Sequence, residues 1–72
     1  MMRGGTLKFF CPMRGFGFIK CDDTGADVFV HASTFEVAGI VPEQGMRLAF
    51  DLQTTRHGRV RAGNLRAERS LE

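Results

Sequence analysis

Two short runs constrain the fold of this chain more than any other feature: residues 14–19 (Arg-Gly-Phe-Gly-Phe-Ile) and residues 28–31 (Val-Phe-Val-His). Alternate residues of a β-strand share a face. One face of the two runs carries rings: Phe16, Phe18, Phe29 and His31. The opposite face is aliphatic, with Ile19, Val28 and Val30. Since one apolar face is enough to build a core, the aromatic face predicts a surface on which unpaired nucleic-acid bases stack.

Turn signals divide the rest of the chain into short strands. Pro12 ends the first strand, Asp-Asp-Thr-Gly at residues 22–25 is strong turn chemistry, and residues 57–58 mark a later turn. The expected strands cover residues 5–11, 16–21, 27–31, 46–54 and 59–66. No window has the periodicity of an amphipathic helix of three turns or more. The pattern predicts an all-β fold, a small closed five-stranded antiparallel barrel of the Greek-key type.

Two stretches complete the expected core and connections. Within residues 46–54, strict alternation places Leu48, Phe50 and Leu52 on one face, which we expect to point inward. The stretch 32–45 has no period of two. There we expect a single helical turn over residues 32–35, followed by a long loop, with Phe35 and Phe50 both in the core.

Length and charge set the limits on function. The 72 residues allow one domain, 1–72, with a core over 5–66 and a tail over 67–72. A core this small supplies only about 3–5 kcal/mol of net stability, so surface phenylalanines need a functional reason. The net charge of +2 and pI near 8.9 are compatible with a polyanionic partner. Arginines crowd the last third: Arg56, Arg59, Arg61, Arg66 and Arg69.

Several function classes are not indicated. There is no long apolar run and no signal-peptide pattern, and Cys11 and Cys21 do not have metal-site spacing. We expect reduced thiols in a cytoplasmic protein, and Leu71-Glu72 fits a cloning scar. The sequence offers no nucleophile–base pair, shielded carboxylate pair, metal-ligand cluster or phosphate-cradling glycine loop. We therefore expect no enzyme activity, no cofactor and no metal.

The motifs together resemble those of bacterial cold-shock proteins. The resemblance rests on residues 5–10, 14–19, 27–31 and 62–65, in that order, and spans residues 5–66. It implies an oligonucleotide-binding (OB) barrel that holds single-stranded RNA and DNA with low sequence selectivity. It also implies roles as an RNA chaperone, in transcription antitermination and in translation control. An RNA-recognition motif fits less well, because the Val-Phe-Val-His run follows the glycine-rich motif and the packing helices are missing.

The resemblance and the residue chemistry together define a candidate binding site. Its residues are Lys8, Phe9, Phe10, Arg14, Phe16, Phe18, Phe29, His31 and Arg59. The rings would stack on bases, and the cations would flank them and contact phosphates. A regular strand turns Phe10 inward after Phe9, whereas the resemblance places both rings on the binding face through a bulge. Lys20 is a further candidate at the edge of the platform.

The chain departs from the family pattern at three aromatic positions. Phe9 stands where the family usually has tryptophan, and Ala32 and Ile40 stand where aromatic residues are common. Because a stacked base contributes about 1–3 kcal/mol, we expect affinity ten- to a hundredfold weaker than that of a fully aromatic relative. The partners expected are single-stranded RNA and DNA and no membrane. We expect a monomer, with a domain-swapped dimer as the alternative state and a protein-interaction module as the alternative function.

Overall fold

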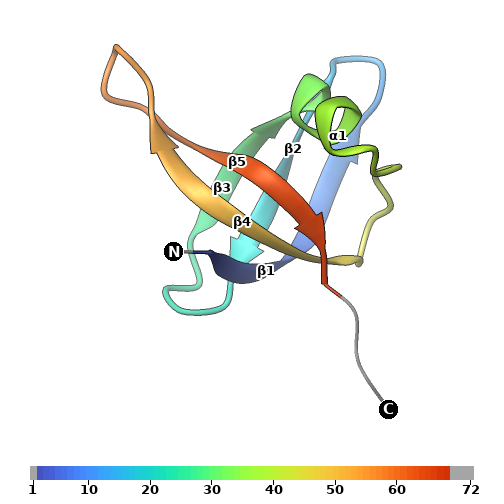
Figure 1. Cartoon of the computed structure of the whole chain (residues 1–72), viewed down its shortest axis with the longest axis horizontal. Helices are drawn as coiled ribbons and strands as arrows, with labels where there is room; N and C mark the ends of the chain where they lie inside the picture. The colour runs from blue at the N-terminus through green and yellow to red at the C-terminus, as the bar shows by residue number, and fades with distance from the viewer. Residues whose placement is uncertain (1, 69–72) are drawn as a thin grey trace.

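Five strands and one short helix make up the computed structural model, which describes residues 2–68 (Figure 1). The strands are β1 (Arg3–Cys11), β2 (Phe16–Cys21), β3 (Asp27–His31), β4 (Arg47–Thr54) and β5 (Val60–Ala67), and the helix is α1 (Ala32–Ala38). The expected order of elements is thus confirmed. The expected tail beyond residue 68, including Arg69 and Leu71-Glu72, lies outside the described residues.

The strands close into a barrel in the order β1-β2-β3-β5-β4, which confirms the five-stranded OB-type fold. The strand pairs are antiparallel except one: β3 and β5 run parallel and register at Phe29 and Arg61. An odd number of strands cannot alternate in direction all the way round a ring. One parallel pair is therefore unavoidable in a closed barrel of five strands.

The core fills the barrel with aliphatic side chains and two phenylalanines. Its buried members are Leu7, Ile19, Cys21, Val28, Val30, Phe35, Leu48, Phe50, Ala62 and Leu65. Leu52 was expected among them, but it is 40% exposed. The pairing of β1 with β4 ends at Phe50, so Leu52 lies on the part of the β4–β5 hairpin that projects beyond the barrel (Figure 1).

A β-bulge in β1 decides which way its rings point. The register with β2 shifts between Leu7 and Phe9, so Leu7 is fully buried whereas Phe9 is 44% exposed. Without the extra residue, the two side chains would share a face. The bulge also turns Phe10 toward the core, where its ring meets that of Phe35 at 5.3 Å in an edge-on contact.

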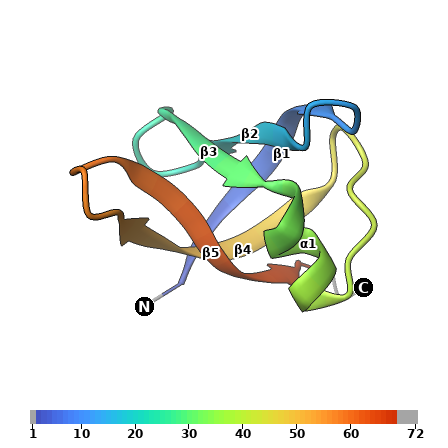
Figure 2. The same cartoon turned by 90° about the horizontal axis from the view of Figure 1, so that it is seen from above.

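The helix α1 covers one end of the barrel beside β5 (Figure 2). It has seven residues, more than the single turn expected. The caps explain the difference: the His31 ring accepts the Ser33 N–H at the start, and Gly39 takes the left-handed conformation at the end with φ 72°. The helix buries Phe35.

No helix among residues 2–68 is long and apolar enough to cross a membrane.

Candidate nucleic-acid interface

Four phenylalanine rings gather on the outer face of β1, β2 and β3, and we call them the aromatic cluster: Phe9, Phe16, Phe18 and Phe29. Phe16 is 5.7 Å from Phe29 in a stacked geometry and 5.9 Å from Phe18 in an edge-on one. The remaining neighbours lie between 6.0 and 6.5 Å apart. The rings are partly exposed, while the aliphatic residues on the opposite face of β2 and β3 are buried.

Strand register lines up part of this surface in a single row across the barrel. Phe9 pairs with Phe18, Phe18 with Phe29, and Phe29 with Arg61. Registered partners on neighbouring strands project from the same face. The row therefore carries three flat rings and then a guanidinium, with Phe16 stacked beside it.

Gly17 allows this close arrangement. It pairs with Phe10 across the bulge of β1. A Cβ at Gly17 would overlap the Phe9 carbonyl oxygen and would lie only 2.9 Å from the Phe10 ring. The glycine lets the two backbones approach, as the expected bare backbone of the glycine-rich motif suggests.

His31 ends β3 next to the aromatic cluster, in register with Phe16. Its Nδ1 lies 3.1 Å from the Ser33 backbone nitrogen and 2.9 Å from Ser33 Oγ. A backbone N–H can only donate, so Nδ1 accepts and the neutral ring carries its proton on Nε2. The Nε2–H is therefore the group that His31 can donate to a phosphate or a base.

The predicted cations have different surroundings. Lys8 Nζ lies 3.4 Å from Asp27 Oδ2, so a phosphate would have to compete with that carboxylate. Arg14 is exposed in the turn between β1 and β2, and Arg59 is exposed just before β5. Lys20 is exposed on β2, in register with Asp27. These residues border the rings from several sides rather than forming one basic patch.

Sequence reasoning left Arg61 out of the candidate site. It is the arginine registered with Phe29, whereas Arg59 lies two residues nearer the tip of the hairpin. The parallel contact between β3 and β5 creates this proximity. No local pattern reveals it, because both arginines alternate toward solvent in the same way. Phe10 is the opposite case, since its ring packs on Phe35 rather than in the aromatic cluster.

The metal-binding side chains and thiols of residues 2–68 are scattered rather than clustered. No cluster of three or more His, Cys, Asp or Glu side chains suited to a metal occurs within residues 2–68. Cys11 and Cys21 are both free thiols. Burial alone would raise the pKa of the Cys21 thiol, but the backbone N–H groups of Thr24 and Asp23 and the Thr24 hydroxyl outweigh it and lower that pKa.

This protein is an OB-type barrel with stacked rings on its outer sheet, an arrangement typical of proteins that bind single-stranded nucleic acids. Comparison with known proteins agrees. Residues 3–67 match the model of the 'Cold-shock' DNA-binding domain. Cold shock protein CspA of Rhizobium meliloti is 46% identical over 68 residues, covering 92% of this chain and 99% of the relative. The major cold shock protein of Streptococcus pyogenes serotype M6 is 40% identical over 58 residues, covering 79% and 85% respectively.

The chain therefore belongs to the cold-shock domain family, as the sequence motifs indicated. Members of this family bind single-stranded nucleic acids and are not enzymes, which confirms the expected class of function. The individual contacts predicted for this chain stay predictions.

Proposed function

We propose that this protein binds single-stranded RNA and DNA by stacking bases on the aromatic cluster, with low sequence selectivity. The observation that carries the proposal is the segregation of side chains on β2 and β3. Aliphatic residues fill the barrel, and the rings remain outside within 6.5 Å of their neighbours. Every base has a flat face, so stacking accepts all four bases.

The flanking groups complete the proposed site. Lys8, Arg14 and Arg59 contact phosphates, and His31 donates from Nε2. Phe10 contributes indirectly, because its ring packs on Phe35 next to the bulge that exposes Phe9. Phe9 in place of tryptophan makes a smaller stacking surface, so the affinity falls below that of relatives with a full set of rings.

In the cell, this binding would give an RNA chaperone. A protein that binds the unpaired strand shifts the equilibrium away from base-paired hairpins by mass action. The same effect on a nascent transcript or a ribosome-binding site would give transcription antitermination or translation control. We propose that it acts in the cytoplasm as a monomer.

Titration of a labelled pyrimidine hexamer at two or more salt concentrations tests the proposal. Each neutralised phosphate contributes about −0.7 to the slope of log K against log salt on single strands. Three or four contacts give a slope of roughly −2 to −3. A duplex of the same sequence is the control and should bind more weakly.

Two results would contradict the proposal. Absence of hexamer binding at low salt would remove the nucleic-acid function for this chain. Equal binding of hexamer and duplex would mean that charge, and not base stacking, holds the ligand. A salt-independent association of the aromatic cluster with a protein would favour the interaction-module alternative.

A further inference from the structure

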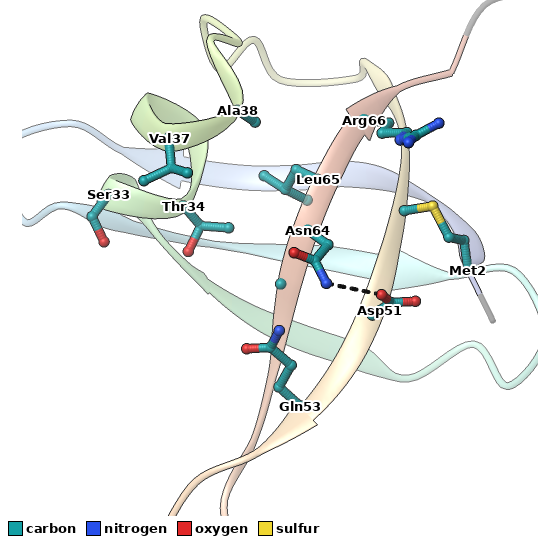
Figure 3. Close-up of a pocket in the computed structure, with 11 residues that line it drawn as sticks. Met2, Ser33, Thr34, Val37, Ala38, Asp51, Gln53, Asn64, Leu65 and Arg66 are labelled. Atoms are coloured by element: carbon teal, nitrogen blue, oxygen red, sulfur yellow. Dashed lines mark hydrogen bonds between the residues drawn. The ribbon is translucent and has the colours of Figure 1, made fainter.

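A groove of about 570 Å³ lies between α1 and the β4–β5 hairpin, beyond the aromatic cluster. Figure 3 shows Ser33, Thr34 and Val37 of α1 on one side and Asn64 and Gln53 of the hairpin on the other. Its volume falls within the range of about 300–1,000 Å³ typical of small-ligand sites. Nothing in the proposed stacking function uses this groove.

Two routes connect the groove with the aromatic cluster. The cross-strand row that runs from Phe9 to Arg61 continues on β4, because Arg61 also registers with Gln53. Gln53 lines the groove and covers Gly63. The second route is at α1, where Ser33 both lines the groove and contacts Nδ1 of His31 at 2.9 Å. A strand lying on the rings thus reaches the groove without leaving the protein surface.

The charges along this path suit a nucleotide. Arg61 registers with Gln53, which lines the groove, and Arg66 lines the groove itself. Neither arginine forms an ion pair with another residue in the range 2–68. Asp51 accepts a hydrogen bond from Asn64 Nδ2 at 3.0 Å inside the groove (Figure 3). That carboxylate repels a phosphate but can accept an N–H from a base, so phosphates belong with the arginines and the base with Asp51.

We infer that the groove holds one or two further nucleotides of the strand that is stacked on the aromatic cluster. Arg61 and Arg66 neutralise phosphates of this extension, and the polar side chains of Gln53, Thr34 and Asn64 bond to the base edge. The inference rests on the proposed function, since it extends the same bound strand. It predicts that a longer strand binds more tightly than a hexamer for two reasons. The longer strand has more positions at which it can bind, and it makes additional contacts in the groove.

Paired titrations of a hexamer and a decamer of deoxythymidine, with matched variants, test this inference. Arg66→Gln and Thr34→Val each remove one polar contact of the groove, and Arg3→Gln removes the same charge at a site that does not line it. The ratio of variant to wild-type affinity is compared at each length. A decamer offers more binding positions than a hexamer to both proteins, so that advantage cancels in the ratio. Melting curves of the three variants check that the fold stays intact.

We expect Arg66→Gln to weaken decamer binding by roughly 3- to 10-fold and hexamer binding by less than about 2-fold. It should also reduce the decamer salt slope by about 0.7 and leave the hexamer slope unchanged. Arg3→Gln should affect both lengths equally.

Equal ratios at both lengths for Arg66→Gln and Thr34→Val would overturn the groove assignment and leave the stacking function standing. A wild-type protein that binds neither oligonucleotide would instead refute the stacking function itself. The two failures are therefore distinguishable in one set of titrations.

Discussion

The same residue type serves two purposes in this protein, and burial separates them. Phe35 and Phe50 are no more than 1% exposed and fill the interior. Phe9 is 44% exposed, and the other rings of the aromatic cluster are partly covered by one another. Substitution of an exposed ring should therefore weaken ligand binding, whereas substitution of a buried ring should lower the stability of the fold.

We predict that Phe29→Ala weakens binding of a pyrimidine hexamer by more than about 1 kcal/mol, because one stacking surface is lost. The variant should still unfold cooperatively. Phe35→Ala is the matched control, and its cost of about 3–5 kcal/mol is comparable to the whole stability of so small a domain. Fluorescence titration and thermal melting measure the two effects. If Phe29→Ala instead loses cooperative unfolding, as expected for Phe35→Ala, the Phe29 ring belongs to the core.

His31 combines a cap with a proposed contact, and two substitutions separate these roles. His31→Ser keeps an oxygen that can cap α1 and should retain wild-type stability, whereas His31→Ala should lose about 0.5–2 kcal/mol. Both variants lack Nε2 and should bind the hexamer more weakly to a similar extent. Denaturant unfolding and titration report the two properties. Wild-type affinity for His31→Ser would show that the ring only caps the helix.

At the scale of elements, the paired strands β1 and β2 approach each other closely at Gly17, beneath the rings. Gly17 faces the bulge, where any side chain would meet the Phe9 carbonyl oxygen. Gly25, in the turn between β2 and β3, has nothing within 4 Å of the Cβ position but has φ 73°. The two glycines therefore differ in the reason for which they are required.

We predict that Gly17→Ala costs at least about 1–3 kcal/mol, because the backbone of β1 must move. Gly25→Ala should cost only the roughly 1–2 kcal/mol of a left-handed backbone. Gly17→Ala should also weaken hexamer binding, since moving β1 displaces Phe9, whereas Gly25→Ala should leave binding unchanged. Urea unfolding and titration check both statements. Equal behaviour of the two variants would contradict the packing explanation.

At the scale of the whole molecule, Arg47 at the start of β4 bonds to Thr6 within β1, to Asp22 just after β2 and to Glu68 just after β5. Its guanidinium donates to Asp22 Oδ1 at 2.9 Å, to Thr6 Oγ1 at 3.1 Å and to Glu68 Oε1 at 2.9 Å. The bond from Arg47 to Asp22, followed by the attraction between their charges, holds the pKa of that carboxyl below its usual range. The guanidinium is thereby neutralised within the fold, so we assign it to stability and not to phosphate binding.

This network predicts a pH dependence of stability. A lowered carboxyl pKa in the folded state stabilises the protein above the unfolded-state pKa, and the contribution is lost as pH falls through the lowered value. Asp22→Asn should lower the melting temperature by a few degrees at pH 7, and the difference from wild type should vanish in acid. Asp23→Asn, which loses a single exposed contact to Arg3 at 3.3 Å, is the control and should change little. An Asp22→Asn deficit that persists unchanged in acid would contradict this account.

Much of the fold could be predicted because strand geometry is local. The alternation in residues 16–19 and 28–31 separates rings from aliphatic side chains whatever the partner strand is, and the turn residues mark the strand ends. Leu52 and α1 were predicted less well. Both depend on where the barrel ends and on which segments cover it, and neither is a property of the neighbouring residues in the chain.

The residue pattern along the chain was enough to predict the family, the barrel and the rings that lie on its outer face. The sequence did not reveal where the bulge in β1 lies, the register of Arg61 with Phe29, or the groove next to α1. These features differ in how far apart in the chain the residues that produce them lie. Facing within a strand is fixed by its own backbone, whereas register, bulges and the parallel closure of β3 on β5 arise from contacts between segments distant in the chain.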